Sequence, residues 1–120
     1  MSERLVDEER ARKVLAALSD GDTAAFGELV ADGIEIHTAR GVRSGHSAAV
    51  AWAANKYEHL QRRYSVERIE QLENGGVLVH GDTEYVWKDG GELADSSPVV
   101  VELHFAGGKL ALWRFREQGA

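Results

Sequence analysis

A change of periodicity near residue 60 constrains the fold of this chain more than any other feature. Before it, apolar residues recur every three or four positions, the spacing of helices that bury one face. After it, apolar and polar residues alternate in long runs between glycine-containing turns, as in antiparallel strands. Helices followed by a series of strands predict an α+β fold. With 120 residues we expect one domain over 1–120, residues 1–6 forming a flexible N-terminal extension.

Three segments carry the helical pattern. The first covers 9–22 and places Val14 and Leu18 on its apolar face. The second covers 23–32 and is predicted to be capped by Asp22, and the third covers 47–60 and is predicted to be capped by Ser47. Small residues along the third helix, with Trp52 nearby, favour close packing on a sheet.

The remaining pattern is that of strands. In the first strand, alternation directs Ile34, Ile36 and Thr38 toward the core, and Glu35 and His37 away from it. The predicted strands cover residues 34–39, 64–73, 76–88, 97–106 and 109–117.

Composition excludes several classes of function. Fourteen basic residues against twenty acidic ones give a net charge of −6, so a nucleic-acid partner is not expected. No window reaches the roughly 20 apolar residues of a membrane span, and the charged N-terminus does not resemble a signal peptide, which predicts a cytoplasmic protein without a membrane partner. The chain has no cysteine, so disulfides and thiolate chemistry are excluded.

Four motifs, "VLAALSDGD", "ADGIEIHTARG", "VRSG" and "GGKLALWRF", follow one another at a characteristic spacing. In this order they resemble the SnoaL-like branch of the nuclear transport factor two-like superfamily, over residues 10–117. The resemblance implies a cone, in which a curved antiparallel sheet wraps around the three helices and leaves an internal pocket. Ketosteroid isomerases, scytalone dehydratase, limonene epoxide hydrolases and polyketide cyclases share this fold, so it does not fix the reaction.

The catalytic positions of two of these enzyme classes are changed in this chain. Alignment with the ketosteroid isomerases places Thr38 at the position of the general base, and Val14 and Val101 at the positions of the oxyanion donors. A threonine is no proton acceptor near neutral pH and valine donates no hydrogen bond, so we reject that reaction. In the limonene epoxide hydrolases and SnoaL-type cyclases an aspartate follows a Trp-Arg-like pair, and here Phe115 stands in its place.

The strand over 77–87 leaves two readings open. One register directs His80, Asp82 and Glu84 into the cone, as an acid/base ladder with mutually shifted pKa values. The other directs the opposite face inward, and burial favours it because three unpartnered ionisable groups are costly to bury. That face carries Val77, Val79, Gly81, Thr83, Tyr85 and Trp87. The charged residues would then join others on a convex face suited to a homodimer contact, namely Glu102, His104, Arg114 and Arg116.

We therefore expect a homodimeric cone-fold protein that binds a small, largely apolar molecule without a complete catalytic set or a cofactor. Metal binding is not expected, because the five histidines are scattered and no His-Glu-x-x-His motif occurs. The residues expected to line the pocket are Val14, Leu18, Ile36, Thr38, Trp52, Tyr85, Val101, Leu103, Trp113 and Phe115.

Two alternatives remain. The first is a lyase, isomerase or cyclase acting on a polyketide- or terpenoid-like substrate, with His80, Asp82 or Glu84 as base and Tyr85 or Thr38 as hydrogen-bond donor. The second is a dimeric interaction module without a ligand, whose cavity is filled by side chains.

Overall fold

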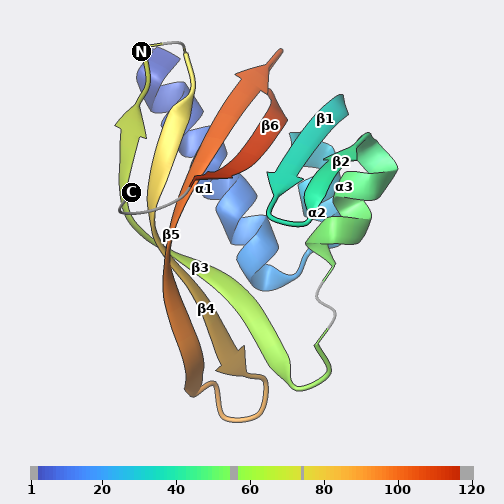
Figure 1. Cartoon of the computed structure of the whole chain (residues 1–120), viewed down its shortest axis with the longest axis vertical. Helices are drawn as coiled ribbons and strands as arrows, with labels where there is room; N and C mark the ends of the chain where they lie inside the picture. The colour runs from blue at the N-terminus through green and yellow to red at the C-terminus, as the bar shows by residue number, and fades with distance from the viewer. Residues whose placement is uncertain (1–2, 55–56, 74, 117–120) are drawn as a thin grey trace.

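The computed structural model describes residues 3–54, 57–73 and 75–116, and within these ranges it has the α+β layout predicted from the sequence. Figure 1 shows α1 running across one face of the sheet, with α2 and α3 beside β1 and β2. The elements are α1 (Glu3–Asp20), α2 (Thr23–Leu29), β1 (Val30–Thr38), β2 (Gly41–Ser44), α3 (His46–Ala53), β3 (Leu60–Gln71), β4 (Val77–Trp87), β5 (Leu93–Ala106) and β6 (Lys109–Arg116).

The six strands form one curved sheet in the order β2-β1-β6-β5-β4-β3. Neighbours are antiparallel except β1 and β6, which pair in parallel, so the expectation of a wholly antiparallel sheet is wrong at this pair. The long chain between β1 and β6 supplies the connection that parallel pairing needs. Register shifts in the β3–β4, β4–β5 and β5–β6 pairs are irregularities of the kind that bend strands and increase their twist.

The hydrophobic core lies between α1 and the concave face of the sheet. Helix α1 packs against β3 and β4, while α3 packs against α2 and β1. Val14 and Leu18 of α1 are almost fully buried, and so are Ile34 and Ile36 of β1, whose alternation is as predicted. Of the residues that the structure describes, no helix is both long enough and apolar enough to cross a bilayer.

Helix ends differ most from the sequence prediction. Helix α1 begins at Glu3 and takes in part of the segment 1–6 that we expected to be an extension. Asp22 does cap α2, because its Oδ1 accepts a hydrogen bond of 3.0 Å from the backbone N–H of Ala25. Helix α2 ends at Leu29, and the chain then enters β1 directly.

The third helix is much shorter than the predicted 47–60. Gly45, and not Ser47, occupies its N-cap position. It ends at Ala53, because Ala54 adopts an extended backbone conformation with φ −63° and ψ 135°. Leu60, which continued the apolar spacing of the helix, instead begins β3 opposite Trp87. Sheet pairing has therefore overridden a local helical pattern.

Candidate functional site

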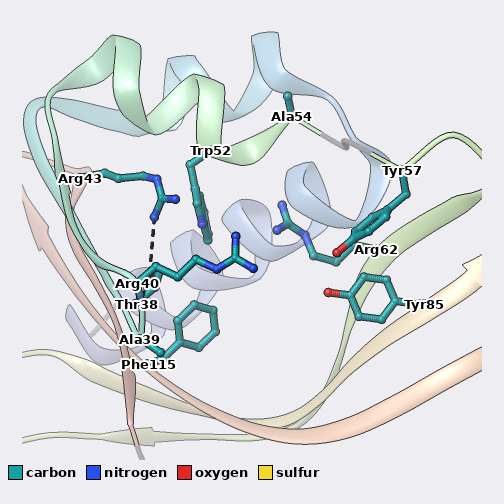
Figure 2. Close-up of a pocket in the computed structure, with 10 residues that line it drawn as sticks. All are labelled: Thr38, Ala39, Arg40, Arg43, Trp52, Ala54, Tyr57, Arg62, Tyr85 and Phe115. Atoms are coloured by element: carbon teal, nitrogen blue, oxygen red, sulfur yellow. Dashed lines mark hydrogen bonds between the residues drawn. The ribbon is translucent and has the colours of Figure 1, made fainter.

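A cavity of about 430 Å³ opens between α3, the β1–β2 turn and the strands β3, β4 and β6. This volume lies within the range of small-molecule pockets. Figure 2 shows the side chains that surround it. They are Thr38, Ala39, Arg40, Arg43, Trp52, Ala54, Tyr57, Arg62, Tyr85 and Phe115.

Aromatic rings form one wall of this cavity. Trp52 of α3 and Phe115 of β6 line it, and both rest on Trp113, which is fully buried behind them. The ring centroids of Trp52 and Trp113 are 5.2 Å apart, and those of Trp113 and Phe115 are 5.6 Å apart, both in edge-to-face geometry. The wall is therefore a packed, preformed apolar surface.

Two tyrosines face each other on another side of the cavity (Figure 2). The rings of Tyr57 and Tyr85 meet edge to face at 5.5 Å, and their side chains are hydrogen-bonded. Burial raises the pKa of Tyr85 above its ordinary value, and the neighbouring Tyr57 raises it further. The Tyr85 hydroxyl therefore stays protonated at neutral pH and is a hydrogen-bond donor rather than a base.

Three arginines from three different segments also line the cavity: Arg40 in the β1–β2 turn, Arg43 on β2 and Arg62 on β3. Arg62 lies over the rings of Trp52 and Tyr64, with its guanidinium carbon 5.2 Å and 5.9 Å from their centroids. No aspartate or glutamate is among the ten described residues that line the cavity. Its polar character is therefore cationic.

Thr38 lies at the cavity but is occupied in holding the β1–β2 turn. Its Oγ1 accepts hydrogen bonds from the backbone N–H of Arg40 at 3.2 Å and from Arg43 Nη1 at 3.4 Å. The hydroxyl donates to the carbonyl oxygen of Gly41 at 3.5 Å. Thr38 therefore positions Arg43, and its own proton is already engaged.

The structure divides the ten residues expected to line a pocket into two groups. Thr38, Trp52, Tyr85 and Phe115 do line the cavity. The other six are at most 2% exposed in the core and do not line this cavity. The six are Val14, Leu18, Ile36, Val101, Leu103 and Trp113.

The three candidate bases on β4 do not line the cavity either. Val77, Val79 and Gly81 of this strand are buried, as the register favoured from the sequence requires. Beyond the register shift between Tyr85 and Val86 the alternation reverses, because Val86 is buried and Trp87 is 46% exposed. His80 Nε2 instead lies 3.1 Å from Glu70 Oε1, and Arg63 Nε donates a 2.7 Å hydrogen bond to Glu84 Oε1. Asp82, two residues from each of them, is likewise not a lining residue. The acid/base ladder is therefore not part of this cavity.

Sequence reasoning did not identify the three arginines, and Tyr57 was not among the ten residues expected to line the pocket. Alternation along β3 puts Arg62 on the same side as Tyr64, but the predicted strand began only at residue 64. Arg40 and Arg43 lie in a turn and a short edge strand, where no periodicity directs them inward. The sequence does carry one signal for them, the basic pair Arg40 and Arg43 within "TARGVRSG", directly after the end of the first predicted strand.

On the opposite face of the sheet, Glu102 is buried to 4% exposure among basic groups. His104 Nε2 lies 2.5 Å from its Oε2, and Arg116 Nη1 donates a 2.6 Å hydrogen bond to its Oε1. The hydrogen bond from His104 lowers the pKa of Glu102, burial opposes this, and Arg116 and Arg114 lower it further. The net effect is that the pKa of Glu102 lies below its ordinary value, so the carboxylate stays ionised to lower pH.

This arrangement predicts an acid-dependent loss of stability. Because the pKa of Glu102 is lower in the folded state, its contribution is present above the ordinary value of 4.5 and is lost as pH falls through the folded-state value. We expect Glu102→Gln to reduce the free energy of unfolding at neutral pH by about 1–3 kcal/mol. The difference between wild type and variant, measured by urea unfolding, should shrink as the pH falls below the ordinary value of 4.5 and through the lower folded-state pKa. Glu67→Gln, at an exposed position on β3, is the control; a pH-independent difference for Glu102→Gln would contradict the assignment.

The described residues contain no group of three or more metal-ligating side chains. The cluster around Glu102 holds one histidine and one carboxylate with two guanidinium groups, and those cations oppose a metal ion.

The curved six-stranded sheet with its three helices has the fold of solved structures described as ketosteroid isomerase-like and NTF2-like. The family model described as "SnoaL-like domain" matches residues 11–113. The chain therefore belongs to the SnoaL-like domain family. A comparison with curated proteins gives no match.

Solved structures with the same fold share little sequence with this chain. An uncharacterized cystatin fold protein from Novosphingobium aromaticivorans is 22% identical with a TM-score of 0.74, covering 98% of this chain and 99% of that chain. An LEH-like epoxide hydrolase from M. tuberculosis is 14% identical with a TM-score of 0.77, covering 92% of this chain and 77% of that chain. A protein from Catenulispora acidiphila in complex with trimethylamine is 15% identical with a TM-score of 0.74, covering 91% of this chain and 85% of that chain. At these identities the likeness shows the fold alone.

Proposed function

We propose that this protein binds a small molecule with a flat, largely apolar body in the cavity between α3 and the open side of the sheet. The observation that carries the proposal is the preformed aromatic wall of Trp52 and Phe115 beside about 430 Å³ of open space. Rings held in place by a buried neighbour bind a flat ligand without first having to be ordered. The trimethylamine complex of the Catenulispora protein supports the view that this fold accommodates small ligands.

Binding is favoured over catalysis by the chemistry of the lining. The ten described lining residues include no histidine or carboxylate, so none of them is a general base of the kind that the isomerases and cyclases require. Tyr57 and Tyr85 supply hydroxyl groups, and Tyr85 is protonated at neutral pH. These groups orient a ligand by hydrogen bonding without removing a proton from it.

The homodimer expected from the sequence stays a prediction, and we propose the convex face of β4, β5 and β6 for it. Glu102, His104 and Arg116 form a compact charged cluster on that face within one chain. Such a preassembled cluster supports a polar contact, since its groups would enter an interface already partnered.

The cavity proposal predicts that filling the space weakens binding. The probe is 2-naphthamide, a flat neutral molecule small enough for the cavity, titrated into the protein by calorimetry. Ala54→Phe places a ring in the cavity, because Ala54 lines it from the end of α3. We expect an affinity loss of about tenfold or more relative to wild type, because the added ring and the ligand together would overpack the site.

Ala51→Phe is the matched control, since Ala51 lies on α3 but is exposed. It should bind 2-naphthamide like the wild type. In a ¹⁵N correlation spectrum, the amides that shift on binding should belong to residues 38–43, 52–54, 85 and 115. Shifts confined to the outer face around Glu70 and His80 would refute the cavity as the binding site.

A further inference from the structure

We propose that the ligand of this cavity carries a carboxylate, which the three arginines recognise while the aromatic wall holds the apolar body. The inference rests on the proposed binding function and makes the class of ligand specific: a flat aromatic or alicyclic acid. The carboxylate is an addition to the expectation from the sequence, which was a small, largely apolar ligand.

The first argument is the local excess of positive charge. The chain as a whole carries −6, with twenty acidic residues against fourteen basic ones. Three of the fourteen line one cavity, and none of the described lining residues is acidic. Like charges gathered in a concave, partly water-excluding site raise the local potential and attract an anion. An anionic ligand would also relieve their mutual repulsion.

The second argument is the incomplete pairing of Arg62. This residue is half-buried, and its Nη2 donates a 3.4 Å hydrogen bond to the carbonyl oxygen of Ala53. Its Nε is buried and has no hydrogen-bond partner among the described residues. No ion pair joins Arg62 to a described carboxylate. The rings of Trp52 and Tyr64 that it contacts offset only part of the cost of partly burying its charge. The guanidinium group of Arg62 therefore lacks a counter-ion among the described residues.

The third argument is orientation. The hydrogen bond from Arg43 to Thr38 fixes one guanidinium group at the side of the cavity formed by β1 and β2. Arg40 extends from the adjoining turn and lines the same cavity (Figure 2). A planar guanidinium group matches the geometry of a carboxylate and can donate two parallel hydrogen bonds to it. The site therefore combines a flat apolar surface with donors suited to a carboxylate.

The test compares 2-naphthoate with 2-naphthamide by calorimetry on the full chain. The two probes have nearly the same shape, but the amide is neutral and carries an NH2 donor where the carboxylate has an acceptor oxygen. We expect the carboxylate to bind the wild type about tenfold more tightly or better, because hydrogen bonds to charged groups are the stronger ones. Arg62→Gln and Arg40→Gln should each remove most of this preference and leave binding of the amide nearly unchanged. Raising the salt concentration should weaken 2-naphthoate alone.

Arg63→Gln is the control, since Arg63 is next to Arg62 on β3 but pairs with Glu84 on the outer face. It should keep the full preference for the carboxylate. Arg40 is exposed, so Arg40→Gln tests the charge even if the change at Arg62 unfolds the protein. Equal affinity for the two probes, or a preference that both cavity variants retain, would overturn the carboxylate assignment alone. If neither probe binds, the proposed binding function fails as well.

Discussion

Gly81→Ala should destabilise this protein by about 3 kcal/mol or more, although it adds a single methyl group in the middle of a strand. Gly81 lies on β4 opposite Val66 of β3, immediately beside the register shift between Val66 and Arg68. A Cβ built on Gly81 would lie 1.9 Å from the carbonyl oxygen of Ser65 and 3.1 Å from the Cα of Val66. Both are backbone atoms, so no side-chain rotation relieves the clash, and the two strands must separate.

Urea unfolding followed by circular dichroism measures this effect as a lower midpoint. Gly33→Ala is the matched control: it is also a strand glycine, and an added Cβ would have no other residue within 4 Å among the residues that the structure describes. It should be neutral or stabilise by a few tenths of a kcal/mol, because alanine restricts the unfolded chain more than glycine does. Equal midpoints for the two variants would show that β3 does not approach β4 as closely as described.

The close approach at Gly81 illustrates what could be predicted from the sequence. Two-residue alternation correctly directed Val77 and Val79 inward and His80 and Glu84 outward, because burial of apolar side chains decides the register of a half-buried strand. The same alternation gave no reason for a glycine at position 81. Its reason is a bulge on the neighbouring strand, and a bulge is a property of two paired strands rather than of one.

The candidate site was predicted less well than the fold, for a related reason. Alternation separates inward from outward residues, but it does not separate a packed core from an open cavity. Val101 and Phe115 are register partners on β5 and β6, yet Val101 is only 1% exposed in the core and Phe115 lines the cavity. The alternation of the two strands does not distinguish them. The cationic lining was missed because Arg40 and Arg62 lie where the predicted elements had not begun or had already ended.

Trp113→Ala should have the largest effect of any truncation, lowering the free energy of unfolding by about 3–5 kcal/mol. Trp113 is fully buried on β6 and contacts the rings of Trp52, Tyr64 and Phe115 at centroid distances of 5.2, 5.6 and 5.6 Å. Its removal leaves a cavity that these three rings border and cannot fill without moving. Since two of them form the wall of the site, binding of 2-naphthamide should weaken in the same variant even under conditions in which it remains folded.

Two companion variants separate packing from the general loss of a tryptophan. Trp87→Ala should change stability by no more than about 0.5 kcal/mol, because Trp87 is 46% exposed at the end of β4. Trp113→Phe should cost less than Trp113→Ala: it keeps a ring in the cluster and removes the indole Nε1–H, which is buried and has no hydrogen-bond partner among the described residues. We therefore expect the highest unfolding midpoint for Trp87→Ala, a lower one for Trp113→Phe and the lowest for Trp113→Ala. If Trp113→Ala unfolds no earlier than Trp87→Ala, the aromatic cluster does not support the cavity wall, and the binding site proposed on it loses its physical basis.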